Sequence, residues 1–126
     1  MDDFSLARRS HRERVDEVLR NGCGGDVRVA MRILEHHPDV ARDGLLTTVV
    51  SGDLAEVDRR LALNPSAASA KGGPLDWGPL LYLAYSRLPL ADASENAVAI
   101  ARLLLGHGAD PNTRFDYAAD IIGAAS

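Results

Sequence analysis

Apolar residues recur along the chain at the spacing of amphipathic helices, and the pattern itself repeats. The segments GDVRVAMRILEHHPDVA (25–41) and GDLAEVDRRLALNPSAA (52–68) align residue by residue at one constant offset. Their apolar positions lie three or four residues apart, so each segment has one face to bury, with Leu34 and Leu61 at equivalent buried positions. A constant offset of 27 residues, from residue 25 to residue 52, is typical of stacked helical repeats, in which each unit buries its apolar face against the next.

Both repeated segments contain residues that begin and end a helix. Asp26 and Asp53 are predicted N-caps, because a carboxylate there accepts hydrogen bonds from backbone N–H groups without a partner inside the helix. Pro38 and Pro65 should end the same helices, since proline lacks an N–H donor and disfavours helical conformation in the residue before it.

The remaining segments fit the same plan of paired helices. Residues 45–51 are apolar and long enough for a two-turn helix, which Gly52 joins to the following helix. Pro79 suits the first turn of a helix over 79–87, and a second helix is expected over 96–105. The buried side of that second helix is predicted to carry Ile100, Ala101, Leu104 and Leu105.

These elements predict one all-α domain. Its expected parts are a helix from Phe4 to Arg20 with a glycine-rich joint (within 1–24), a degenerate repeat (25–44), a repeat (45–72), a repeat with an inserted loop at 88–95 (73–112), and an incomplete C-terminal unit (113–126).

Composition narrows the class of protein. A chain of 126 residues is expected to form one domain, and its net charge of −4 disfavours binding to nucleic acid, which rests largely on neutralising phosphates. The single cysteine, Cys23, cannot form an internal disulfide, and the N-terminus does not have the pattern of a secretory signal. No apolar stretch is long enough to cross a bilayer, so a cytoplasmic protein without a membrane partner is expected.

Two stretches resemble the ankyrin repeat: GPLLYLA (78–84) and AIARLLLGHGADPN (99–112). In that family the inner helix begins Thr-Pro-Leu-His-x-Ala, and the outer helix ends Leu-Leu-x-x-Gly-Ala-Asp-x-Asn. Residues 104–112 match the second pattern, whereas in the first pattern Gly78 replaces the threonine and Leu81 the histidine. The matching residues of the first pattern are Pro79, Leu80 and Ala84.

The resemblance extends from about residue 25 to residue 112. SGDLAEV (51–57) is similar to the family's turn between helices, and the match is degenerate toward the N-terminus. KGGPLDWGPLLYLAYSR (71–87) is similar to the start of a repeat in longer bacterial ankyrin-repeat proteins, which continue with further repeats. The chain is therefore expected to be the N-terminal portion of such a protein.

The resemblance implies an ankyrin-like α-solenoid that binds an unknown partner protein through its concave face. The loop before the inner helix would project as a finger and carry Trp77, an aromatic anchor of the kind that supplies binding energy. The alternative is that Trp77 and Tyr82 pack as core. The loop before the inner helix also contains Pro74. The expected partner-binding residues are Leu75, Asp76, Trp77, Tyr85, Ser86 and Arg87.

Residues with possible chemistry each have a plainer explanation. The glycines of LLLGHGADPN (103–112) follow a helix, as C-terminal caps do, whereas a phosphate loop follows a strand and usually has a lysine. EHHPD (35–39) is interpreted as the C-terminus of a helix, where histidine is favourable near the negative end of the helix dipole, rather than as a metal site. The sequence assigns Cys23 no general base that would make it a nucleophile. The basic run at 8–14 is diluted by acidic residues and is interpreted as a solvated helix face. No catalytic residue, metal or cofactor is therefore expected.

Three functions remain open from the sequence. The first is the non-enzymatic protein-interaction module, and the second is a structural or regulatory fragment of a longer ankyrin protein. The third, a small hydrolase or metal enzyme, would need His11, His36, His37 or His107 around a pocket. An exposed apolar surface is expected at 96–105 with the tail AADIIGAAS (118–126), which has little charge to cap a stack. The chain should self-associate there or continue into a further repeat.

Overall fold

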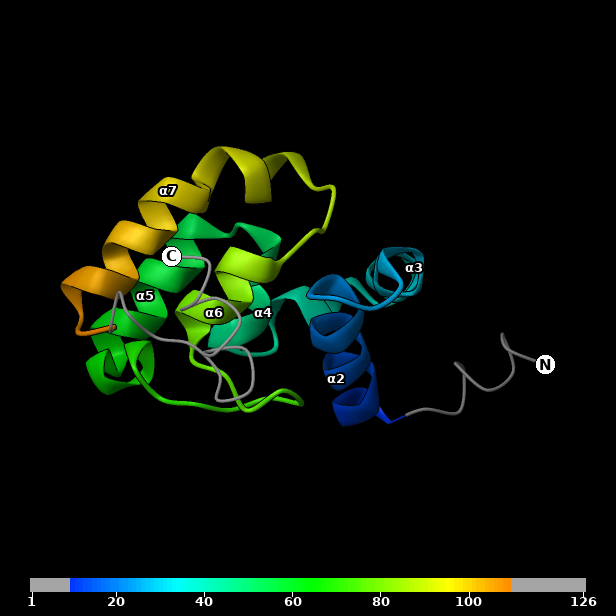
Figure 1. The fold of residues 1–126 in the computed structure, drawn as a ribbon, viewed down its shortest axis with the longest axis horizontal. Coiled ribbons are helices and arrows are strands. Elements are labelled where there is room, and N and C mark those ends of the chain that lie inside the picture. Colours follow the sequence, from blue (N-terminus) through cyan, green and yellow to red (C-terminus); the bar gives the residue numbers. More distant parts are fainter. Residues whose placement is uncertain (1–9, 110–126) are drawn as a thin grey trace, which may run out of the picture.

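A computed structural model describes residues 10–109 of the chain, and within this range the fold is all-helical apart from one isolated β-bridge (Figure 1). The elements are α2 (His11–Gly22), α3 (Val27–His36), the 3₁₀ helix η1 (Pro38–Arg42), α4 (Leu45–Ser51), α5 (Leu54–Leu63), the 3₁₀ helix η2 (Pro65–Ala68), α6 (Pro79–Tyr85) and α7 (Ala91–Gly106). The predicted helical residues 4–9, and the predicted incomplete unit at 113–126, lie outside the described range.

Within residues 10–109 the α-helices form three consecutive hairpins, α2 with α3, α4 with α5, and α6 with α7. The first helices lie in one row, because α4 contacts α2 on one side and α6 on the other. The second helices α5 and α7 contact each other, and α7 also reaches α4. In Figure 1 the row α2, α4, α6 runs through the middle of the molecule, with α5 on its left and α7 along the upper left.

The repeat seen in the sequence is reproduced in the local structure of α3 and α5. Asp26 accepts a hydrogen bond from the Arg28 N–H at 3.0 Å, and Asp53 accepts one from the Glu56 N–H at 3.2 Å, so both predicted N-caps are confirmed. The two helices end at corresponding residues and both continue into a 3₁₀ turn that begins with the predicted proline. Local chain geometry therefore follows the sequence repeat closely.

Burial does not repeat in the same way. Leu61 of α5 is fully buried, but Leu34 of α3 is only half-buried, and Ile33 beside it faces the core at 2% exposure. The expected equivalence of Leu34 and Leu61 is therefore wrong. The neighbours of the two helices differ: α3 packs mainly against α2 and η1, whereas α5 contacts both α4 and α7.

Helix α7 is longer than expected. It begins at Ala91, so the predicted inserted loop at 88–95 shrinks to the three residues before the helix. Ile100 and Leu104 are fully buried, as predicted, but Leu105 is 41% exposed and its predicted burial is wrong. Residues that looked turn-like can extend the helix because Asp92 is favourable in a first turn and the preceding hairpin packs against this end.

That packing involves Gly52, which forms the predicted turn between α4 and α5 with φ of 79°. Its carbonyl oxygen accepts a hydrogen bond from the Asn96 side chain at 2.8 Å. A Cβ atom on Gly52 would lie 2.2 Å from the backbone nitrogen of Ala93. Glycine is thus required twice, by the left-handed backbone and by the close approach of α7.

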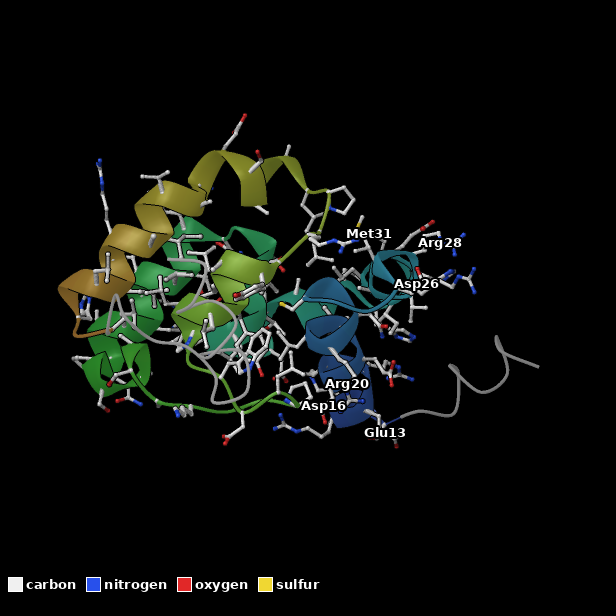
Figure 2. All side chains as sticks on the ribbon, viewed as in Figure 1. Glu13, Asp16, Arg20, Asp26, Arg28 and Met31 are labelled. Atoms are coloured by element: carbon white, nitrogen blue, oxygen red, sulfur yellow. The ribbon has the colours of Figure 1, made fainter. Side chains whose placement is uncertain are left out.

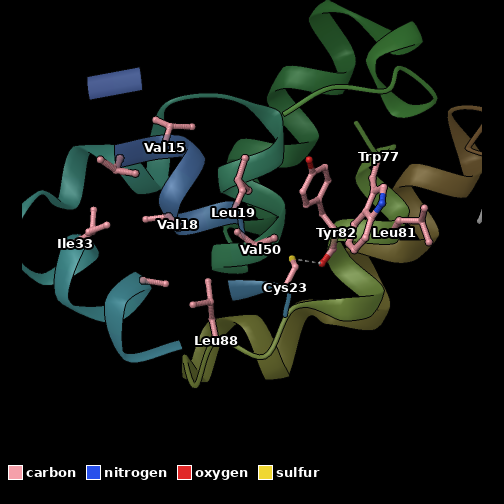
Figure 3. Packing of buried hydrophobic residues seen from close by; sticks show 12 residues of the cluster. Val15, Val18, Leu19, Cys23, Ile33, Val50, Trp77, Leu81, Tyr82 and Leu88 are labelled. Atoms are coloured by element: carbon pink, nitrogen blue, oxygen red, sulfur yellow. Dashed lines mark hydrogen bonds between the residues drawn. The ribbon is translucent and has the colours of Figure 1, made fainter. Parts of the chain in front are cut away.

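Helix α4 divides the interior into two cores. Val50 belongs to a core formed with α2, α3 and α6, part of which is drawn in Figure 3. Val49, its neighbour, belongs to a second core formed with α5 and α7. Adjacent residues of a helix point about 100° apart, so the short apolar α4 contributes to both. Two buried threonines of α4 satisfy their hydroxyls on backbone carbonyls of the same helical turn.

Candidate interaction surface

The loop before α6 is fastened to that helix by Tyr82. The hydroxyl of Tyr82 donates a hydrogen bond to the carbonyl oxygen of Gly72 at 2.7 Å and accepts one from the backbone N–H of Leu75 at 3.1 Å. Gly72 and Trp77 close the loop through the isolated antiparallel bridge. The loop at 72–77 is therefore a fixed turn against α6.

Trp77 is part of the core, with 8% of its surface exposed. Its ring packs at a tilt against Tyr82 and Tyr85, with ring centroids 5.4 and 5.5 Å apart, and Figure 3 shows the indole beside Tyr82. The structure thus supports the core alternative, and the indole is not an exposed anchor. The composition of the loop could not reveal this, because the covering aromatic rings come from the helix that follows.

The other expected contact residues differ in exposure. Asp76 and Arg87 are exposed, whereas Leu75 and Tyr85 are half-buried and pack against the first core. Ser86 is half-buried at the end of α6. The backbone N–H of Arg87 donates a hydrogen bond to the carbonyl oxygen of Gly22 at 2.7 Å, which holds the end of α6 beside the end of α2.

A cleft that the sequence did not predict lies between α2, the beginning of α4 and the segment at 70–73; we call it the α2–α4 cleft. It encloses about 390 Å³. Its apolar lining includes Val15, Leu19, Leu46 and Pro79. Its charged residues are Arg12, Asp43 and Lys71. Because these residues are far apart in the sequence, only the tertiary structure brings them together.

The three charged residues that line the α2–α4 cleft differ in whether they form an ion pair. Asp43 is engaged by His11, whose Nε2 lies 2.6 Å from the carboxylate, and Asp39 lies 3.4 Å from the other ring nitrogen. Arg12 and Lys71 are exposed and form no ion pair with any residue between 10 and 109. Two cations without an ion-pair partner among residues 10–109, beside an apolar floor, therefore characterise this cleft.

Other ion pairs have structural roles at helix ends. Arg28 pairs with the N-cap carboxylate of Asp26 at 3.2 Å, and Figure 2 shows the two side chains together at the start of α3. In α5, the hydrogen bond from Arg59, Nε to carboxylate oxygen at 2.9 Å, lowers the pKa of Glu56 to about 2. The side-chain hydrogen bond from Arg28 likewise holds the pKa of Asp26 below its ordinary value. Both carboxylates are therefore ionised at neutral pH, and they stabilise the N-terminal ends of α3 and α5.

Cys23 lies in the turn between α2 and α3 and is 7% exposed. Its thiol donates to the carbonyl oxygen of Tyr82, with Sγ to oxygen at 3.4 Å, and burial raises the pKa of Cys23 to about 12. The thiolate is the nucleophilic form, so this environment suppresses reactivity at neutral pH. The expected structural role of Cys23 agrees with its burial.

The glycine-rich segment after α7 caps the helix. Gly106 is the last helical residue, and Gly108 has φ of 106°. The N–H of Ala109 donates to the carbonyl oxygen of Leu104 at 2.9 Å, the bond that closes a Schellman motif. The predicted helix cap is confirmed as far as residue 109, and the rest of the motif at 110–112 lies outside the described range.

The described part of the chain contains no group of three or more histidine, cysteine or acidic side chains placed to hold a metal ion. His36, in the EHHPD segment, is exposed at the end of α3. Between residues 10 and 109, none of the helices combines the length and apolar character needed to cross a membrane. The chain matches no protein-family model, and no similar protein was found among curated proteins or solved structures.

Proposed function

We propose that this chain is a non-enzymatic protein-interaction module, built as an ankyrin-like stack of helical hairpins. Support comes from three consecutive hairpins whose first helices adjoin in one row. It also comes from the repeat, whose caps, helix ends and 3₁₀ turns recur between α3 and α5. Stacked hairpins present a broad surface of helix ends and loops, which suits binding of an extended or helical segment.

The α2–α4 cleft is the observation that carries the proposal. Its apolar floor can receive one apolar side chain, and Arg12 and Lys71 can pair with a carboxylate beside it. The chain as a whole has a net charge of −4, so the two cations of the cleft form a local positive patch. Such a patch favours a partner segment that carries a negative charge at the matching place. The partner segment should therefore contain an acidic residue next to a large apolar one. Leu75 and Asp76, expected contact residues, lie on the loop that leaves this cleft.

Selection from a random peptide-display library tests this proposal. Peptides with an acidic residue adjacent to an apolar residue should be enriched on the wild-type chain, and Arg12→Glu or Lys71→Glu should lower their affinity about tenfold by replacing attraction with repulsion. Arg20→Glu is the matched control, because Arg20 is an exposed cation of the same helix α2 outside the cleft. Equal enrichment on wild-type and rim variants would refute the cleft as the binding surface.

A further inference from the structure

The large apolar side chains most exposed between residues 10 and 109 all lie on α5 and α7. Leu63 of α5 is 74% exposed, and Val98 and Leu105 of α7 are 64% and 41% exposed. Along α7, Val98, Arg102 and Leu105 follow one another at spacings of four and three residues, so they form one strip on the helix surface. Both α5 and α7 thus expose large apolar side chains, and on α7 a charged residue, Arg102, lies between two of them.

A groove lies between these two helices; we call it the α5–α7 groove. It encloses about 560 Å³ and is lined by Leu54, Ala55, Asp58, Ala99, Arg102 and Leu103. Four of these six residues are apolar, and the two that are charged come from different helices. Asp58 lies on α5 and Arg102 on α7, and both are exposed. Neither pairs with the other or with any other residue in the described range.

We propose that the α5–α7 groove is a self-association surface, on which two copies of this chain meet about a two-fold axis. Asp58 of each copy pairs with Arg102 of the other, and the apolar side chains of the two grooves cover one another. A two-fold axis that passes through the midpoint between an acidic and a basic residue places the acid of one copy opposite the base of the other, and the reverse. Such a surface is therefore its own electrostatic complement. A partner other than a second copy would need to match the same two charges by its own sequence.

Burial of apolar surface supplies the affinity of this association, and the two charge pairs set its orientation. The pairs are symmetry-related, so one substitution changes both at once. Each pair lies at the edge of an open groove and contributes modestly to binding by itself. Reversal of one charge, however, replaces two attractions by two repulsions.

Sedimentation equilibrium of the full chain across a concentration series is the direct test. The wild type should show a monomer–dimer equilibrium, and Asp58→Arg or Arg102→Asp should each raise the dimer dissociation constant about tenfold or more, since two pairs become repulsive together.

An equimolar mixture of the two variants should form a heterodimer with nearly wild-type affinity. In that heterodimer the arginine introduced at position 58 faces the aspartate introduced at position 102, and the unchanged Arg102 of one copy faces the unchanged Asp58 of the other. Glu35→Arg and Arg20→Asp, at exposed positions on α3 and α2, are matched charge-reversal controls and should leave the equilibrium unchanged.

Several results would overturn the proposal. A wild-type chain that stays monomeric at every concentration excludes the dimer, and single variants that associate as the wild type does exclude these charge pairs. A mixture that does not recover affinity excludes the two-fold arrangement. If instead a monomeric chain is destabilised by the groove variants independently of concentration, the groove is covered by the chain itself. None of these results depends on peptide binding at the α2–α4 cleft, so the two proposals can fail separately.

Discussion

Substitution of Gly52 by alanine tests how the second and third hairpins are joined. Three effects add at this position. A residue with a Cβ atom in the left-handed backbone region costs about 1–2 kcal/mol. Loss of the Asn96 hydrogen bond to the Gly52 carbonyl costs about 0.5–1.5 kcal/mol. The Cβ atom would lie 2.2 Å from the Ala93 nitrogen, so the first turn of α7 must move, at about 1–3 kcal/mol of overpacking.

Gly52→Ala should therefore lower the free energy of unfolding by about 2.5–6.5 kcal/mol, a large part of the stability of a domain of this size. Two other glycines separate the contributions. Gly108 has φ of 106°, but no residue of the described range 10–109 lies within 4 Å of a Cβ atom there, so Gly108→Ala should cost only the backbone strain of about 1–2 kcal/mol. Gly106 is helical and likewise has no neighbour within 4 Å of a Cβ atom among residues 10–109, so Gly106→Ala should stabilise the chain by about 0.5–1 kcal/mol.

Urea unfolding followed by circular dichroism, with thermal melts as a check, measures the three differences. The melting temperature of Gly52→Ala should fall about 10 °C below that of Gly108→Ala, since each kcal/mol corresponds to several degrees in a domain of this size. Equal destabilisation by Gly52→Ala and Gly108→Ala would show that only backbone conformation matters. The close contact between the α4–α5 turn and α7 would then be refuted.

Tyr82→Phe should cost about 1–3 kcal/mol, because it leaves the Leu75 N–H and the Gly72 carbonyl without their hydrogen bonds; a melting temperature unchanged from wild type would show that the loop is not fastened there. Cys23 should resist alkylation by iodoacetamide at pH 8 in the native chain and react readily in denaturant, as followed by mass spectrometry; fast native labelling would contradict its burial and its pKa of about 12. The pKa of Glu56, ordinarily 4.5, is lowered to about 2 by the hydrogen bond and charge of Arg59, so its stabilising contribution is complete above about pH 4.5 and is lost as the pH falls toward 2. Denaturant unfolding across this pH window should give a shallower loss of stability for Glu56→Gln than for wild type, and parallel curves would refute the assignment.

The sequence by itself determined the local elements where a short-range signal exists. The two aspartate caps, the two prolines that end helices, the turn at Gly52 and the glycine cap after α7 all depend on residues within a few positions of one another. The all-helical class followed from the spacing of apolar residues. Ankyrin-like stacking remains a proposal, since hairpins alone do not specify it.

Tertiary packing decided which faces are buried and where a surface forms. Ile33 is buried in place of Leu34 because α3 lacks the flanking neighbours of α5, and Leu105 is exposed because only one side of α7 meets other helices among the described residues. The start of α7 depends on contact with the turn at Gly52, which lies far earlier in the chain.

The candidate surfaces show the same division most clearly. Trp77 could be interpreted from its loop as an anchor, but two tyrosines from α6 cover it. Arg12 and Lys71 carry no motif, yet they share one cleft, and Asp58 and Arg102 share one groove. Helical periodicity acts over three or four residues, so it fixes where helices form; the meeting of charges from distant helices is set by how those helices pack.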